Sequence, residues 1–173
     1  MVDPVAQPNE YQALLLRYLG ERDPAAVQAR TPDVLEALVK EAGDRLRTPP
    51  APEEWSVIEL LGHVHDAEIV MAGRYRWTIA HDEPPLMGYD QDLWVERLRH
   101  ADDDPQALLE VFAALRSANI DLWRRATPEG RRRFGMHAER GPESIELSFR
   151  MVAGHDLFHI EQIERTLSAV ADA

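Results

Sequence analysis

The sequence predicts an all-α protein, a four-helix bundle with a short additional N-terminal helix. Apolar residues recur with helical spacing in four long segments, and proline or N-cap signals precede each of them. No alternating strand pattern of convincing length, internal repeat or low-complexity tract interrupts them. A chain of 173 residues is the size of one domain. We therefore expect a single domain over residues 1–173, with its core at about 31–170. The four long helices are expected to be antiparallel, with the second and fourth adjacent.

The first elements are predicted from the start signals that precede them. The short N-terminal helix is expected around NEYQALLLRYLG, residues 9–20. The first long helix is expected to open at Thr31-Pro32, because proline is well tolerated in the first helical turn. The second has a capping-box pattern, Ser56 with Glu59 three residues later, and covers residues 57–80 before a proline pair.

The remaining two long helices also follow proline signals. Asp104-Pro105 is expected to open the third helix, and Gly141-Pro142 the fourth, which continues to the C-terminal region. The connection between the second and third helices is longer than an antiparallel bundle needs. Such excess length is typical of a functional loop.

Charge and composition narrow the class of partner. The net charge of -12 and pI near 5.0 disfavour binding to nucleic acid and to anionic membrane surfaces. The one basic run, Arg131 to Arg133, is better explained as a solvated turn between helices than as an anion site. No apolar stretch or leader predicts a membrane association, so a cytoplasmic location is expected. Without cysteine, any thiol chemistry needs an external thiol.

Two histidines lie four positions apart in the last helix, in the stretch GHDLFHIEQI. Positions four apart differ by about 40° around a helix, so His155 and His159 project from one face. Val152 and Ile163 share this arc, which indicates that both imidazoles point into the bundle. This spacing predicts a pair of metal ligands.

A third inward histidine completes the predicted site. In the second long helix His63 shares its face with apolar residues, whereas His65 lies about 200° round and should face solvent. Three imidazoles leave one position at a metal open for substrate or water. Alone, each histidine could be a hydrogen-bonded core residue, but three buried imidazoles without a metal would be costly.

A di-iron carboxylate site is the alternative metal architecture. It needs Glu-x-x-His motifs on two helices, and the sequence has none. Asp156-x-x-His159 comes nearest, and Asp156 could instead accept a hydrogen bond from an imidazole N–H.

The residues that carry these signals resemble the DinB/YfiT-like family of metalloenzymes. The resemblance rests on a "WS…H" helix start at residues 55–63 and a terminal "HD..H..Q" pattern in GHDLFHIEQI, and it covers nearly the whole chain. It implies a four-helix bundle, often a homodimer, whose metal ligands would be His63, His155 and His159. It leaves His65, His81, His100 and His137 as expected surface residues.

The resemblance also implies a reaction class. Members of the family are similar to thiol-dependent transferases that use bacillithiol, mycothiol or glutathione, or are named metal-dependent hydrolases. We expect a divalent metal (zinc, nickel or iron) and transfer of a low-molecular-weight thiol to an electrophilic small molecule. The alternatives are metal-dependent hydrolysis and a non-catalytic bundle that binds a metal or a small ligand.

No general base can be identified from the sequence. Glu59 is explained by the capping box, and Asp66 could orient a ligand or pair with a basic group. An internal ion pair is expected for Arg74, three turns beyond His63 on its face. In the long connection, Tyr89 and Trp94 could line the pocket or anchor the loop.

Overall fold

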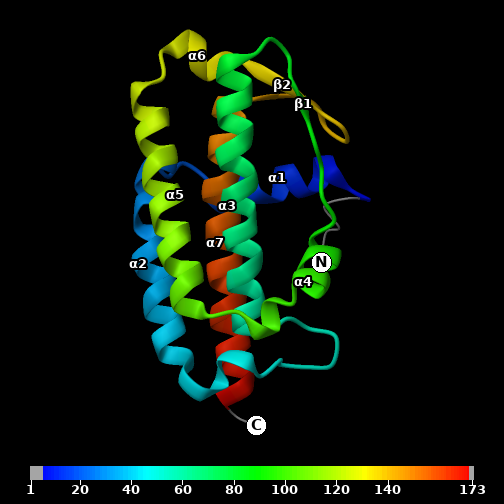
Figure 1. Cartoon of the computed structure of the whole chain (residues 1–173), viewed down its shortest axis with the longest axis vertical. Helices are drawn as coiled ribbons and strands as arrows, with labels where there is room; N and C mark the ends of the chain where they lie inside the picture. Colours follow the sequence, from blue (N-terminus) through cyan, green and yellow to red (C-terminus); the bar gives the residue numbers. More distant parts are fainter. Residues whose placement is uncertain (1–5, 172–173) are drawn as a thin grey trace.

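The computed structural model describes residues 6–171 as a bundle of long helices with a small sheet near one end (Figure 1). The bundle helices are α2 (Pro24–Ala42), α3 (Val57–Ala80), α5 (Pro105–Arg125) and α7 (Ile145–Ala171). Shorter helices are α1 (Pro8–Leu19), α4 (Gln91–Leu98), α6 (Pro128–Arg132) and the 3-10 turns η1 (Gly43–Arg47) and η2 (His100–Asp102). The predicted all-α four-helix bundle with an extra N-terminal helix is confirmed.

The helices do not simply alternate in direction along the chain. In Figure 1, α2 runs down, α3 and α5 both run up, and α7 runs down. The chain can place two successive long helices in parallel because the connection from α3 to α5 retraces the bundle, and α4 lies on that path. We expected four antiparallel helices, and this part of the prediction is wrong. The expected neighbours α3 and α7 are antiparallel and in contact.

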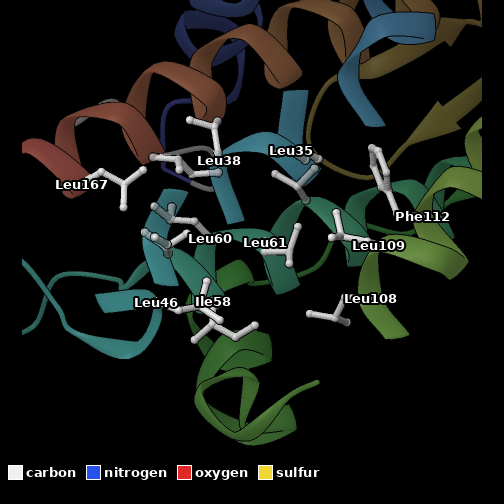
Figure 2. Close-up of a cluster of buried hydrophobic side chains, with 14 residues drawn as sticks. Leu35, Leu38, Leu46, Ile58, Leu60, Leu61, Leu108, Leu109, Phe112 and Leu167 are labelled. Atoms are coloured by element: carbon white, nitrogen blue, oxygen red, sulfur yellow. The ribbon is translucent and has the colours of Figure 1, made fainter. Parts of the chain in front are cut away.

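The core fills the space between the four long helices. Its largest buried cluster joins side chains of α2, α3, α5 and α7, including Leu35, Leu61, Phe112 and Leu167 (Figure 2). Because each helix contributes one apolar stripe, burial of these stripes provides the main driving force for the bundle. Within residues 6–171 no helix has both the length and the apolar character needed to cross a membrane.

A three-stranded sheet covers one end of the bundle, which the sequence analysis did not predict. Strands β1 (Pro85–Leu86) and β2 (Phe134–His137) pair in parallel, and β2 pairs with β3 (Gly141–Ser144) in antiparallel register. The predicted helix start at Gly141-Pro142 is therefore wrong. The helix begins at Ile145, where the Ser144 hydroxyl accepts a hydrogen bond from the backbone N–H of Leu147. Strands this short carry too few residues for an alternating pattern.

The start of α2 also differs from the prediction. The N-cap is Asp23, whose side chain accepts a hydrogen bond from a backbone N–H, so Pro32 lies inside the helix. Proline cannot donate to the carbonyl four residues earlier, that of Gln28. The guanidinium of Arg116 donates to this carbonyl at 3.2 Å instead. A side chain from α5 thus satisfies the backbone group that the proline leaves free.

Two predicted helix starts are confirmed. The backbone N–H of Ser56 donates to the Glu59 carboxylate at 2.8 Å, and both halves of the capping box are present. At the start of α5, the Asp104 side chain accepts from the N–H of Gln106 at 3.0 Å.

Helix α1 packs directly on the backbone of α7. A Cβ atom at Gly154 would overlap the backbone carbonyl of Leu15, so only glycine permits this approach. The contact holds Tyr11 and Leu15 beside α7, where both line the main pocket. Gly154 immediately precedes His155, and the close approach of α1 therefore lies next to the histidine pair.

We expect Gly154→Ala to destabilise the protein by about 1–3 kcal/mol, because the added methyl group meets backbone and the two helices must move apart. Chemical denaturation measures this loss. Gly130→Ala is the matched control, since a Cβ there makes only ordinary contacts, the nearest at 3.5 Å from the Thr127 hydroxyl. Equal stability of the two variants would contradict the close contact.

Candidate metal centre

Three histidines meet between α3 and α7. The Nε2 atom of His63 lies 3.0 Å from Nε2 of His155 and 3.2 Å from Nε2 of His159. The spacing of four residues places the α7 pair on one face, and the antiparallel packing brings His63 of α3 against it. His63 and His159 are buried and His155 is half-buried. All three predicted site residues are therefore brought together.

The surroundings keep the three rings neutral. Burial, reinforced by the neighbouring histidines, lowers the pKa of His63, His155 and His159 well below the usual value for histidine. The His159 Nδ1–H donates to the side-chain oxygen of Gln162 at 3.0 Å, which leaves the Nε2 lone pair facing the other two rings. A neutral imidazole with a free ring nitrogen is the form that binds a metal.

The nitrogen spacing fits a metal ion. With zinc to nitrogen bonds of about 2.0–2.1 Å, two ligands of a tetrahedral site lie roughly 3.3 Å apart. The 3.0 and 3.2 Å separations are close to this value. One neutral ring can donate only one proton, so hydrogen bonds alone cannot satisfy three converging nitrogens. These residues are the group among residues 6–171 that could hold a metal.

Aromatic rings enclose the histidines. The Trp55 ring lies 5.3 Å from the His63 ring, and Phe158 meets His159 edge-on at 4.9 Å, both between centroids. Such apolar contacts fix ring orientation and limit the access of water. Trp55 belongs to the "WS" pattern of the helix start, so its position explains part of that pattern.

A pocket of about 800 Å³, counted to its open mouth, leads from the histidines along α3 and α7. His63 and His155 line one end. Arg74 lines the other, eleven residues further along α3, and residues of the β2–β3 hairpin lie beside it. Between these ends the lining combines apolar side chains, such as Ala67 and Val70, with charged residues of a buried ion network. The 800 Å³ includes open solvent, and the cavity volume proper is about 100 Å³.

A buried ion network borders the pocket beneath the histidines. Arg116 of α5 pairs with Asp156 of α7 and, at 2.9 Å, with Glu68 of α3. The same guanidinium reaches the Gln28 carbonyl of α2, so one side chain connects all four bundle helices. Burial alone would lower the pKa of Arg116, but the two carboxylates raise it above its usual value, and the group stays charged. The network has one more negative than positive charge, which favours a cation nearby.

Asp156 does not hold an imidazole, as we had considered possible. Its carboxylate accepts hydrogen bonds from Arg116 and, at 2.8 Å, from the Thr31 hydroxyl. Glu68 accepts from Asn119 at 2.8 Å as well as from Arg116. Neither carboxylate has an oxygen free to act as a general base.

The other four histidines were expected at the surface, and two of these expectations are wrong. His81 is exposed, and His65 is half-buried with Nδ1 3.2 Å from the Leu108 carbonyl. His100 and His137 are each 4% exposed. Their burial follows from the η2 turn and the β2 strand, elements that the sequence analysis did not anticipate.

His100 is held between two carboxylates. Its Nε2 and Nδ1 lie 2.8 and 2.6 Å from Asp66 and Asp103, so both nitrogens act as donors only in the charged ring. The hydrogen bond to Asp66 contributes most to raising the pKa of His100. Asp66 therefore meets a basic partner and does not touch the metal ligands.

We expect this pair to make stability depend on pH. A raised pKa in the folded state gives stabilisation that is complete below the ordinary histidine pKa of 6.5 and is lost as pH rises through the raised pKa. Melting temperature should therefore fall more from pH 6.5 into the alkaline range for the wild type than for His100→Gln. The melting temperature of His81→Gln, a control at an exposed position, should change with pH as that of the wild type does. Parallel profiles for wild type and His100→Gln would contradict this prediction.

The remaining sequence candidates have mixed outcomes. Arg74 is buried, but among residues 6–171 it forms no ion pair, so the expected internal ion pair is wrong. Tyr89 lines the pocket, and burial raises its pKa to about 12. Trp94 lies in α4 with its ring 4.4 Å from that of Tyr89.

The basic run Arg131 to Arg133 is not a turn between two helices, because Arg131 and Arg132 belong to the short helix α6 and strand β2 follows Arg133. Its guanidinium groups are directed to different partners: the Trp123 ring, Glu129 and Asp82 respectively. They do not form a common anion site.

Several pocket residues were not predicted from the sequence. They include Arg116, Glu68, Arg140 and Glu143, and, outside the pocket lining, Gln162, which hydrogen-bonds His159. Gln162 had a signal, since it is the last member of the "HD..H..Q" pattern, three residues after His159. The others had none, because charged side chains in helices and hairpins are normally exposed and only the packing shows otherwise.

Comparison with known proteins agrees with this architecture. YfiT from Bacillus subtilis, described as a probable metal-dependent hydrolase with an unusual four-helix bundle topology, superposes with a TM-score of 0.75. The two share 21% sequence identity over 84% of this chain and 86% of that one, which establishes the common fold. No curated protein sequence shows a significant match. The family model of the DinB superfamily matches residues 25–163, and the chain therefore belongs to the DinB superfamily.

Proposed function

We propose that this protein is a metal-dependent enzyme in which His63, His155 and His159 bind one divalent ion, and that it transfers a low-molecular-weight thiol to an electrophilic small molecule. The observation that carries the proposal is the convergence of three neutral imidazole nitrogens at one end of a pocket. Three neutral imidazoles suit zinc, nickel or iron. Family membership and the likeness to YfiT, described as a probable metal-dependent hydrolase, support a metal-dependent reaction.

The chemistry that such an ion supplies is Lewis acidity, which lowers the pKa of a coordinated thiol or water. The chain's own residues hold the ligands, exclude water and shape the pocket. Gln162 orients His159, and the rings of Trp55 and Phe158 shield the histidines. In the transfer, the thiol releases its proton to solvent and its sulfur bonds to the electrophilic carbon. The bond to the leaving group breaks, and the leaving group departs with the electron pair.

The state of the carboxylates favours a thiol over water as nucleophile. The buried acids that line the pocket, Glu68, Asp156 and Glu143, are all engaged by arginine and by further hydrogen bonds. Within the described part of the chain, none of these three buried acids therefore offers water an unengaged carboxylate oxygen. A thiol with an ordinary pKa of about 8.5 needs less assistance than water at about 15.7. The chain has no cysteine, so the thiol is a second substrate.

Hydrolysis is the second candidate function, because YfiT carries that description. Turnover of 1-chloro-2,4-dinitrobenzene with and without glutathione or cysteine tests the first function, and turnover of p-nitrophenyl acetate tests the second. We expect metal-dependent conjugation that needs added thiol, is lost in His63→Ala and is retained in His81→Ala, a control at an exposed position.

Each result has a distinct meaning. Ester cleavage without thiol, lost in the same variant, would favour the hydrolase. Bound metal without turnover of either substrate would favour a non-catalytic metal-binding bundle. Elemental analysis of protein purified without an affinity tag identifies the ion, and absence of a stoichiometric metal from protein that had been offered it would overturn the metal site.

A further inference from the structure

At the end of the pocket away from the histidines, Arg74 presents a guanidinium without a carboxylate partner. The residue is 7% exposed. Its Nη2 contacts the Met87 carbonyl and its Nη1 the Met71 sulfur at 3.9 Å, while its buried Nε–H has no hydrogen-bond partner. Buried cations in proteins are normally paired because loss of hydration is costly. This guanidinium therefore lacks the acceptor that such burial requires.

The His137 side chain, which lies beside Arg74, also lacks a hydrogen-bond acceptor. Its Nε2 lies 3.3 Å from the Arg74 Nη2, and its Nδ1 lies 3.2 Å from the backbone N–H of Glu139. Burial and the charges of Arg140 and Arg74 lower the pKa of His137 to about 4, so the ring carries one proton. If Nδ1 accepts from the backbone, Nε2 carries that proton and two donors face each other. An acceptor placed between them would satisfy both.

The remaining charges at this end leave one positive charge uncompensated within the buried set. Arg140 pairs with Glu143 at 2.6 Å, and the Ser148 hydroxyl also donates to Glu143 at 2.6 Å. Glu139 also lines the pocket, but it is exposed to solvent, which screens its charge. Arg74 therefore remains the buried cation without a direct counterion.

We propose that Arg74 and His137 bind the carboxylate of a small molecule whose reacting end lies at the histidine centre. The Arg74 Nε–H and the His137 Nε2–H supply two donors for the two oxygens of a carboxylate, and the charge of Arg74, which has no direct counterion, attracts it. A phosphate monoester carries about -1.5 to -2 charges and three acceptor oxygens, which exceeds this complement. The position of the reacting end rests on the proposed function, whereas binding of the carboxylate does not.

The geometry also limits the shape of the ligand. Arg74 lies eleven residues beyond His63 on one helix, a rise of roughly 16 Å between backbones. Both side chains line the same pocket, and apolar residues together with Glu68, which Arg116 engages, lie between them on α3. The ligand is therefore an extended molecule with an acid at one end, an apolar or neutral middle and the reactive group at the other.

Calorimetric titration with hexanoate and its neutral analogue hexanamide tests the carboxylate site. Because hexanoate could also bind a metal, the titrations use both the wild type and His159→Ala. We expect hexanoate to bind about tenfold more tightly than hexanamide in both proteins. Arg74→Gln should abolish this preference, and Arg74→Lys should keep part of it. Arg124→Gln, which removes an exposed cation, should keep it fully.

Several outcomes would overturn the proposal. One is equal binding of hexanoate and hexanamide by the wild type, and another is a preference for hexanoate that survives in Arg74→Gln. A third is loss of this preference in His159→Ala, which would place the acid on the metal. Tighter binding of hexyl phosphate than of hexanoate would contradict the choice of carboxylate. If Arg74→Gln does not fold, the proposal is tested by whether Arg74→Lys prefers hexanoate over hexanamide less strongly than the wild type does. If His159→Ala still prefers hexanoate over hexanamide, this result supports the carboxylate site even if no enzymatic turnover is found.

Discussion

Replacing His159 by alanine is expected to abolish stoichiometric metal binding and all metal-dependent activity. The residue is 2% exposed, and its Nε2 faces the other two histidines. Two remaining imidazoles bind an ion less tightly than three do, and the substitution also leaves a cavity where the ring was buried. Elemental analysis and the activity assays described above measure the loss.

Thermal unfolding separates the loss of a ligand from the loss of buried volume. Metal at about 100 times its dissociation constant stabilises the folded state by about 2.7 kcal/mol, or roughly 5–10 °C for a chain of this length. We expect this increase in the wild type and in His81→Ala, and none in His159→Ala. A wild type that melts at the same temperature in chelator and in saturating zinc or nickel would refute the metal centre.

Arg116→Met is expected to cause the largest loss of stability. The change leaves Glu68 and Asp156 buried without their common cation, and each is less than 3% exposed. Removal of one partner from a buried ion pair costs about 3–5 kcal/mol, equivalent to roughly 10 °C in melting temperature. Arg124→Met on the same helix is the control, because its partner Asp121 is exposed and the pair is worth about 0–1 kcal/mol.

The loss should also depend on pH. In the wild type, burial raises the pKa of Asp156, while the Arg116 charge opposes this shift. Without Arg116 the pKa in the folded state rises further, so destabilisation is complete above that pKa and decreases as pH falls towards the unfolded value. Arg116→Met should therefore lose less stability at pH 5 than at pH 8, relative to the wild type. A loss that does not change with pH would indicate a packing defect rather than uncompensated carboxylates.

The sequence predicted the parts of the fold and site that depend on local signals. The Ser56–Glu59 capping box and the Asp104 N-cap fix helix starts through contacts within four residues. The histidine pair of α7 is also a local pattern, because one helical turn determines that both rings share a face. His63 could be selected because its helix has a clear apolar side.

The parts that were missed depend on contacts between distant segments. Pro32 was read as a helix start because the sequence does not show that Arg116 replaces the lost backbone donor. The direction of α5 depends on where the connection of residues 81–104 leads the chain, and no local pattern encodes that. His100 and His137 are buried by irregular segments whose positions follow from tertiary packing. The extent of the domain, 1–173 with a core at about 31–170, stays a prediction.

The connection that carries the chain back along the bundle between α3 and α5 affects the kinetics of folding. In an up-and-down bundle, short turns join neighbouring helices, and contacts form between segments close in sequence. Here α2 packs along α7, and their hydrogen bond between Gln28 and Phe149 joins residues 121 positions apart. Folding rates fall as the sequence separation of contacts grows, so this chain should fold more slowly than an up-and-down bundle of equal length. During synthesis the histidine centre can assemble only after α7 has emerged, which makes the last helix the element that completes the site.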